Sequence, residues 1–208
     1  MPDMPVTQSF ATPAGSAESA WERSLAGRPG VLVAFLWGLA EATFFFLIPD
    51  VFLSLVAILG GRRTWRHILA AICGALVGGA LLFHWAQAHP VQAHAAVARV
   101  PFIRERMFAQ VDEGLRTQGL SAVFLGSVAG IPYKLYAVEA PRFTSQRDFL
   151  LATPPARAVR FVVLWIVFGG AATWLRKRRK WRTPELVRLH AVLWIVSYAF
   201  YWGRIVFR

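Results

Sequence analysis

The sequence contains a single cysteine, Cys73, and only 11 acidic residues against 23 lysines and arginines. One cysteine excludes an intrachain disulfide, so cysteine content gives no information about the redox compartment. Charged residues make up only 16% of the chain, whereas 56% of its residues are hydrophobic and the mean hydropathy is +0.46. This composition is too apolar for an ordinary soluble domain and predicts an integral membrane protein.

The basic residues gather in two clusters between apolar stretches, at residues 61–67 and 176–182. Loops held at an anionic membrane face explain such clusters better than nucleic acid does, so no nucleic-acid partner is expected. Residues 1–30 lack the basic and short apolar regions of a signal peptide and are rich in Pro, Ala and Ser. We interpret them as a mobile tail before a membrane domain at residues 31–175. Residues 176–208 then form a basic loop and a C-terminal transmembrane helix.

Residues 31–59 are apolar apart from Glu41 and Asp50. As one straight helix they would measure about 43 Å, which overshoots a hydrocarbon core of about 30 Å. Pro49 interrupts the run because proline lacks an amide hydrogen and restricts the residue before it. Two shorter helices in a re-entrant hairpin fit better than one steeply tilted span, which stays open as the alternative.

Residues 68–86 are predicted to form a spanning helix, in which Gly74, Gly78 and Gly79 let another helix approach closely. Residues 88–117 are amphipathic and are expected to lie along the interface or to cover the embedded segments. Residues 119–140 are apolar but contain Gly130, Pro132 and Lys134, which predicts a second re-entrant hairpin.

Thr153, Pro154 and Pro155 are typical of a helix start, so a spanning helix is predicted over residues 153–175. Another helix follows Thr183, and its aromatic residues suit an interfacial belt. These aromatic residues are Trp194, Tyr198, Tyr201 and Trp202.

The predicted fold is therefore an all-α polytopic membrane protein with two re-entrant helical hairpins packed among three to four transmembrane helices. If each hairpin returns to its own side, the two basic clusters share one side of the membrane. The positive-inside rule then predicts that side to be the cytoplasm.

Charged side chains inside a membrane are costly and need a partner, a water-filled cavity or a role. Glu41 is expected either to load and release a proton or to lock helices together in an ion pair. Asp50 can act in the same way or can cap the helix that follows Pro49. Replacing either by its amide is expected to impair function more than folding.

The basic residues in the apolar stretches are candidates for anion binding. Lys134 is expected at a solvated hairpin turn, with snorkelling to the interface as the alternative. Arg157 and Arg160 share one helical face near the predicted helix start, where they could bind a phosphate or anchor the helix at head-group level. No catalytic constellation is visible, so an enzyme is not expected. His89 and His94 lack neighbouring ligands, so neither a metal nor a cofactor is expected.

Several motifs in this order and spacing resemble the DedA/VTT family, also called SNARE-associated Golgi proteins, and within it the YqaA-like branch. The motifs are Ala40-Glu-Ala-Thr-Phe-Phe-Phe-Leu-Ile-Pro-Asp50, Gly74-Ala-Leu-Val-Gly-Gly79, Ala129-Gly-Ile-Pro-Tyr-Lys134 and Ala156-Arg-Ala-Val-Arg-Phe161. The resemblance covers about residues 31–175. It implies two re-entrant hairpins that face each other, with Glu41 and Asp50 as the acidic pair of the first hairpin and Lys134 as a basic member of the second. Arg160, together with Arg157, then matches the arginine that follows in the family. Glu139 departs from the family pattern and could neutralise Lys134 or Arg142.

The resemblance also implies translocation of a phospholipid or polyprenyl-phosphate lipid between leaflets, with protons as a possible coupling ion. The expected location is the bacterial plasma (inner) membrane with the basic loops cytoplasmic, and an oligomer is compatible with the sequence. One alternative is a proton-coupled transporter of a small solute. Another is a non-transporting scaffold for membrane assembly, in which the embedded charges are closed salt bridges.

Overall fold

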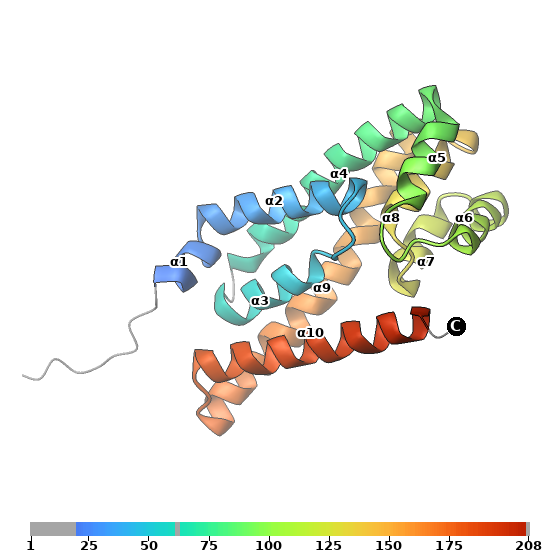
Figure 1. Ribbon diagram of the computed structural model, residues 1–208. Helices are drawn as coiled ribbons and strands as arrows, with labels where there is room; N and C mark the ends of the chain where they lie inside the picture. The colour runs from blue at the N-terminus through green and yellow to red at the C-terminus, as the bar shows by residue number, and fades with distance from the viewer. Residues whose placement is uncertain (1–19, 61–62, 207–208) are drawn as a thin grey trace, which may run out of the picture.

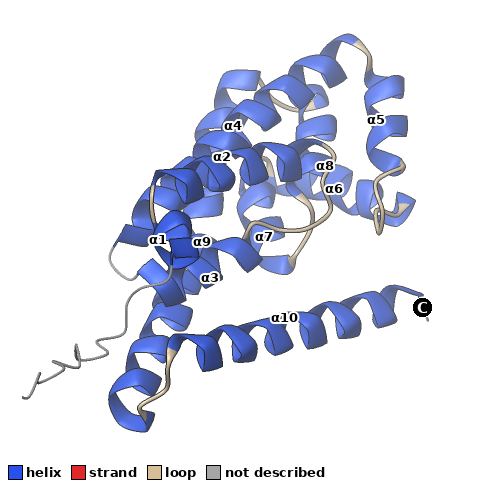
Figure 2. Cartoon of the chain, turned by 60° about the vertical axis from the view of Figure 1, so that its left-hand side comes forward, coloured by secondary structure: helices blue, strands red, loops and turns tan. Residues whose placement is uncertain are grey.

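The computed structural model describes residues 20–60 and 63–206 and is built from helices, with no strand in those residues (Figure 2). The basic cluster at 61–67 is therefore described only from Arg63 onward. In chain order the α-helices and their bounds are α1 Ala20–Ala26, α2 Arg28–Thr43, α3 Asp50–Gly60, α4 Thr64–Ala88, α5 Pro90–Ala98, α6 Glu105–Gln118, α7 Ser121–Ala129, α8 Tyr133–Glu139, α9 Gln146–Arg179 and α10 Thr183–Val206. A short 3-10 helix, η2 Ala140–Arg142, follows α8.

Two helices, α4 and α9, are long and apolar enough to cross a membrane. The pair α1 and α2, bent by 55° between them, is a third candidate if it forms one span. The predicted membrane character is thus supported, with two or three candidate spans. In the part of the chain that the structure describes, α10 is not among them, although the sequence predicts that it crosses.

Both predicted breaks interrupt helices in the structure. Residues 44–49 separate α2 from α3, and α3 then runs back toward α1 (Figure 1). Residues 130–132 separate α7 from α8. Both hairpins pack against α9, through α3 and through α7. Residues 20–30, assigned to the N-terminal tail from the sequence, are largely helical.

The predicted glycine contact holds α4 against α2. A Cβ atom on Gly74 would lie 2.0 Å from the Phe35 carbonyl oxygen, and one on Gly78 would lie 2.7 Å from the Leu39 oxygen. At the reciprocal position, a Cβ atom on Gly38 would lie 2.1 Å from the Ala71 carbonyl oxygen. The two helices can approach this closely only because glycine has no side chain. Their close packing buries Glu41 of α2.

The amphipathic segment after α4 covers the second hairpin. Phe108, Val111 and Leu115 of α6 are buried at helical spacing and join the core formed with α7 and α8. The sequence offered two places for this segment, and the packing of α6 agrees with its covering the embedded helices.

The helix predicted to begin at Thr153 actually begins at Gln146. Ser145 caps it, because its Oγ accepts a hydrogen bond from the Asp148 amide at 3.2 Å. Pro154 and Pro155 lie inside α9, where the Thr153 hydroxyl donates to the Phe149 carbonyl at 2.9 Å. The Ser145-x-x-Asp148 capping pattern outweighs the prolines, since neighbouring helices and threonine hydroxyls stabilise a proline-containing helix in a membrane.

The described part of the first basic cluster, residues 63–67, and the second basic cluster lie at one end of the molecule. Arg176, in the last turn of α9, donates to the Ile58 carbonyl at 3.0 Å, near the C-terminus of α3 and the start of α4. The guanidinium donates to a carbonyl at the end of α3, and its positive charge interacts favourably with the negative end of that helix dipole.

Candidate functional site

The first part of the site is the break between α2 and α3. The Pro49 carbonyl accepts a hydrogen bond from the Leu53 amide at 2.9 Å, which starts α3. On the other side of the break, the indole of Trp37 donates to the Leu47 carbonyl at 3.0 Å. These hydrogen bonds hold both sides of the break, and the Phe45 carbonyl within it faces the second hairpin.

The break between α7 and α8 is built by the residues predicted to build it. Gly130 ends α7 in the left-handed region, with φ of 82°, where a side chain would be strained. Pro132 is the extended residue that precedes α8. Lys134 follows in the first turn of α8, and its Nζ donates to the Phe45 carbonyl of the opposite break at 3.0 Å.

Lys134 is thus placed differently from the expectation. Its side chain is only 2% exposed, so neither a solvated turn nor snorkelling describes it. The ammonium instead joins the two breaks, and it lies within electrostatic reach of Glu41. The predicted meeting of the two hairpins is consistent with this contact.

Glu41 and Arg157 form a buried ion pair. Arg157 Nη2 donates to Glu41 Oε2 at 2.5 Å, and the two side chains are 8% and 4% exposed. The guanidinium also lies over the Tyr133 ring, 4.5 Å from its centroid. Arg157 is therefore held by a carboxylate and an aromatic face at once, which is a strong site for a desolvated arginine.

Asp50 and Arg160 form the second ion pair. Arg160 Nε and Nη2 contact the two carboxylate oxygens at 2.9 and 2.7 Å, in the paired geometry of a guanidinium and a carboxylate. Arg160 Nη1 also donates to the Ser127 carbonyl of α7 at 3.2 Å. In the described chain the recorded partner of the Asp50 carboxylate is thus Arg160, not an amide of α3 as the capping hypothesis expected.

Both arginines lie well inside α9, because the helix begins at Gln146, and both are paired with carboxylates, whereas their anchoring at head-group level stays a prediction. The two ion pairs tie α9 to the two arms of the first hairpin, α2 and α3. They differ in exposure, because Arg160 is 29% exposed whereas Arg157 is buried. Arg160 is therefore the more accessible of the two cations.

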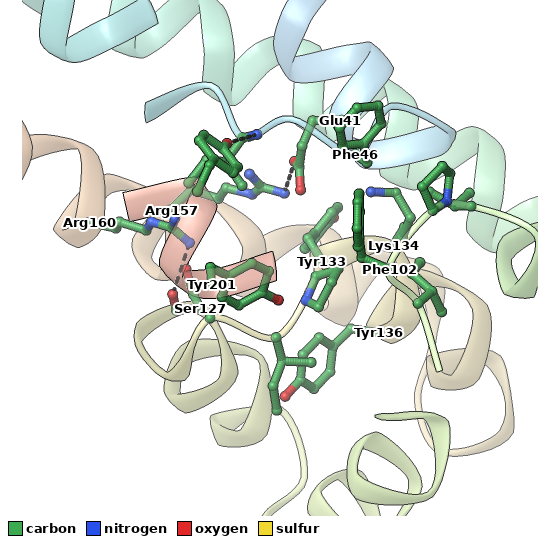
Figure 3. A pocket seen from close by; sticks show the side chains of 18 of the residues that line it. Glu41, Phe46, Phe102, Ser127, Tyr133, Lys134, Tyr136, Arg157, Arg160 and Tyr201 are labelled. Atoms are coloured by element: carbon green, nitrogen blue, oxygen red, sulfur yellow. Dashed lines mark hydrogen bonds and ion pairs between the residues drawn. The ribbon is translucent and has the colours of Figure 1, made fainter. Parts of the chain in front are cut away.

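A cavity of about 440 Å³ lies where these groups meet (Figure 3). Four of the five predicted charged residues line it, whereas Asp50 lies behind Arg160. These four residues are Glu41, Lys134, Arg157 and Arg160. The remaining walls are mainly aromatic and apolar, so the cavity offers cations at one region and hydrocarbon contact elsewhere.

The sequence did not identify α10 as part of this cavity. Trp194, Tyr198 and Tyr201 line it, and the Tyr198 hydroxyl accepts a hydrogen bond from the Ile48 amide at 3.3 Å. Trp194 Nε1 donates to Ser54 of α3 at 3.0 Å. Trp194 and Tyr198 are half-buried against the protein, whereas Tyr201 is 43% exposed, and the interfacial belt stays a prediction. The side chain of Trp202 lies outside the described part of the structure.

The charges of the site do not cancel. Among the described residues, Lys134, Arg157 and Arg160 face two carboxylates, Glu41 and Asp50, and both carboxylates are bonded to arginines. The Lys134 ammonium has a neutral carbonyl as its recorded hydrogen-bond partner. With all five groups ionised, one positive charge is in excess, and such a charge favours an anion in the cavity.

Glu139 does not take part in this balance. Its carboxylate contacts Arg142 Nη2 and accepts a hydrogen bond from His94 Nδ1 at 3.1 Å. Arg142 also contacts Asp112 of α6. Of the two cations that Glu139 could neutralise, the structure therefore pairs it with Arg142, and Lys134 remains available at the cavity.

Within residues 20–60 and 63–206, no group of three or more His, Cys, Asp or Glu side chains could hold a metal ion.

No family model, curated protein or solved structure matches this chain significantly.

Proposed function

We propose that this chain is an integral membrane protein of the DedA/VTT type that moves a lipid with an anionic phosphate head group between leaflets. The observation that carries the proposal is the cavity lined by Lys134, Arg157 and Arg160 between two broken helical segments. Irregular backbone at membrane depth is tolerated where it lines a cavity or is buried in protein. In the proposal both hairpins are re-entrant and the basic end of the molecule is cytoplasmic.

The ion pairs suggest how a head group would enter. A phosphate oxygen can replace the Asp50 carboxylate on Arg160, because phosphate and carboxylate accept the same paired hydrogen bonds. The displaced carboxylate then needs a proton or another cation, since an unpaired charge is costly there. Asp50 and Glu41 are therefore the groups through which a proton would be coupled to lipid movement.

Liposomes that contain the purified protein test this function. Lipids with a fluorescent label and different head groups are placed in both leaflets, and a membrane-impermeant quencher reports those that reach the outer leaflet. We expect rapid exchange for an anionic phosphate lipid, slow exchange for Arg160→Gln, and unchanged exchange for Gly170→Ala, whose added Cβ would meet no atom within 4 Å. Exchange equal to that of protein-free liposomes refutes the proposal, and uptake of a soluble ion without lipid exchange favours the small-solute transporter.

The two closed ion pairs favour one further candidate, a non-transporting scaffold. In a scaffold the charges serve only to join α9 to α2 and α3, so exchanging the partners should preserve function. The variant Glu41→Arg with Arg157→Glu separates the two models. The scaffold is supported if the variant keeps the full activity of the protein in cells and the protein exchanges no lipid. A ligand at Arg157 is supported if the variant folds but loses that activity.

A further inference from the structure

A second cavity, of about 520 Å³, lies where α1 bends into α2 and where α4 begins. It shares no lining residue with the cavity that contains Glu41. Three arginines, Arg28, Arg63 and Arg66, line it together with Trp65. Val31 and Leu69 supply apolar wall.

The bend that opens this cavity is fixed by close contacts. A Cβ atom on Gly30 would lie 1.8 Å from the Leu25 carbonyl oxygen, so α1 can fold back there only against a glycine. The ring nitrogen Nε2 of His67 in α4 donates to the same carbonyl at 3.0 Å. Packing and a hydrogen bond therefore fix the position of the α1–α2 bend against the first turn of α4.

The charged side chains that line this cavity are all positive. Its three arginines are exposed, and no Asp or Glu is among the described residues that line it. Arg63 precedes α4, so the positive end of that helix dipole adds to the attraction for an anion. The Arg66 guanidinium lies over the Trp65 ring at 5.6 Å, which keeps the two side chains together.

The apolar residues point to a lipid and not to a soluble anion. Trp65 is 48% exposed and Leu69, one helical turn later, is 51% exposed. α4 is a candidate membrane span, so its first turn falls at the level where lipid head groups and tryptophan side chains meet. Leu32 and Leu36 of the neighbouring helix α2 are also exposed.

We propose that this cavity binds the anionic phosphodiester head group of a membrane lipid, with its acyl chains along Val31 and Leu69. The lipid joins the α1–α2 bend to α4 from outside and is bound, not transported. Basic pockets between helices at one membrane face recognise anionic lipids in this way. The site is independent of the transport cavity, so either proposal can fail without the other.

Quenching of Trp65 by lipids brominated in their acyl chains tests this site in the full-length protein in detergent. The chain has nine tryptophans, so the difference between wild type and Trp65→Phe isolates the signal of interest. We expect brominated phosphatidylglycerol to quench Trp65 at concentrations at least tenfold below those of brominated phosphatidylcholine. The double variant Arg28→Gln with Arg66→Gln should weaken this binding about 25-fold, at about fivefold per arginine.

Two further variants keep the test specific. Arg178→Gln with Arg179→Gln removes the same charge from the other basic cluster and should change the affinity by less than twofold. Arg28→Lys with Arg66→Lys keeps the charge and should stay within about threefold of wild type, which separates lost binding from lost folding. Equal quenching by both lipids, an equal loss in the control variant, or competition by soluble glycerophosphoglycerol at the lipid's own concentration would overturn the proposal.

Discussion

The buried pair of Glu41 and Arg157 predicts that Glu41→Gln destabilises the protein. From the sequence alone, the amide is expected to preserve folding because it keeps the shape of the side chain. In the structure, however, the Arg157 side chain is only 8% exposed. Glu41→Gln removes the negative charge that lies 2.5 Å from Arg157 Nη2. Removing one partner of a buried ion pair costs about 3–5 kcal/mol. We expect about 3 kcal/mol, since the glutamine oxygen can still accept a hydrogen bond and Tyr133 still faces the guanidinium.

Thermal melting in detergent measures this loss. For a chain of this length 1 kcal/mol shifts Tm by about 2–4 °C, so Glu41→Gln should melt about 6–12 °C lower than wild type. The double variant Glu41→Gln with Arg157→Gln should recover part of the loss, because no charge is then left buried, with a coupling free energy of about 0.5–3 kcal/mol. A Glu41→Gln protein as stable as wild type, or additive effects of the two substitutions, would refute the reasoning.

Two other predictions concern helix packing and topology. Gly74→Ala should lower stability by about 1–3 kcal/mol, because its Cβ would lie 2.0 Å from the Phe35 carbonyl oxygen, whereas Gly170→Ala should be neutral or slightly stabilising in the same melting experiment. Cysteine introduced at Arg63 or Lys177 in a Cys73→Ala background should not react in intact cells with an impermeant maleimide, and ready labelling of either position would contradict a cytoplasmic basic end.

The positions of the breaks could be predicted from the sequence because they depend on local backbone chemistry. Pro49 lacks an amide hydrogen and Gly130 adopts the left-handed conformation readily, so both mark a break locally, although Pro154 and Pro155 inside α9 show that proline alone does not end a helix. Gly74 and Gly78 likewise permit a close approach by any partner. The start of α9 was missed because Thr153, Pro154 and Pro155 imitate a helix start. The Ser145-x-x-Asp148 capping pattern was the local signal that identifies the true start.

The partners in the site could not be predicted in this way. Glu41 and Arg157 are 116 positions apart, and only the packing of α9 against α2 and α3 chooses which carboxylate meets which arginine. Nor does any local pattern show that Trp194 and Tyr198 line the cavity, because α10 is apolar around most of its surface. Such pairings are properties of the tertiary arrangement, even when each residue is a reasonable candidate by itself.

Lys134 donates to a neutral carbonyl, whereas the two carboxylates of the site are bonded to Arg157 and Arg160. We therefore expect its charge to contribute to the binding of a phosphate head group. Lys134→Met keeps the length of the side chain and removes its charge, so binding of a phosphate-headed lipid should fall at least as much as in Arg160→Lys. If both cations contact one phosphate, Lys134→Ala and Arg160→Ala should be coupled by about 0.5 kcal/mol or more in lipid binding. Lys134 is 2% exposed, so each variant is compared by melting temperature before binding is measured. Additive binding effects, together with strong coupling of Lys134 to Glu41, would mean that the ammonium neutralises a carboxylate and does not contact the lipid.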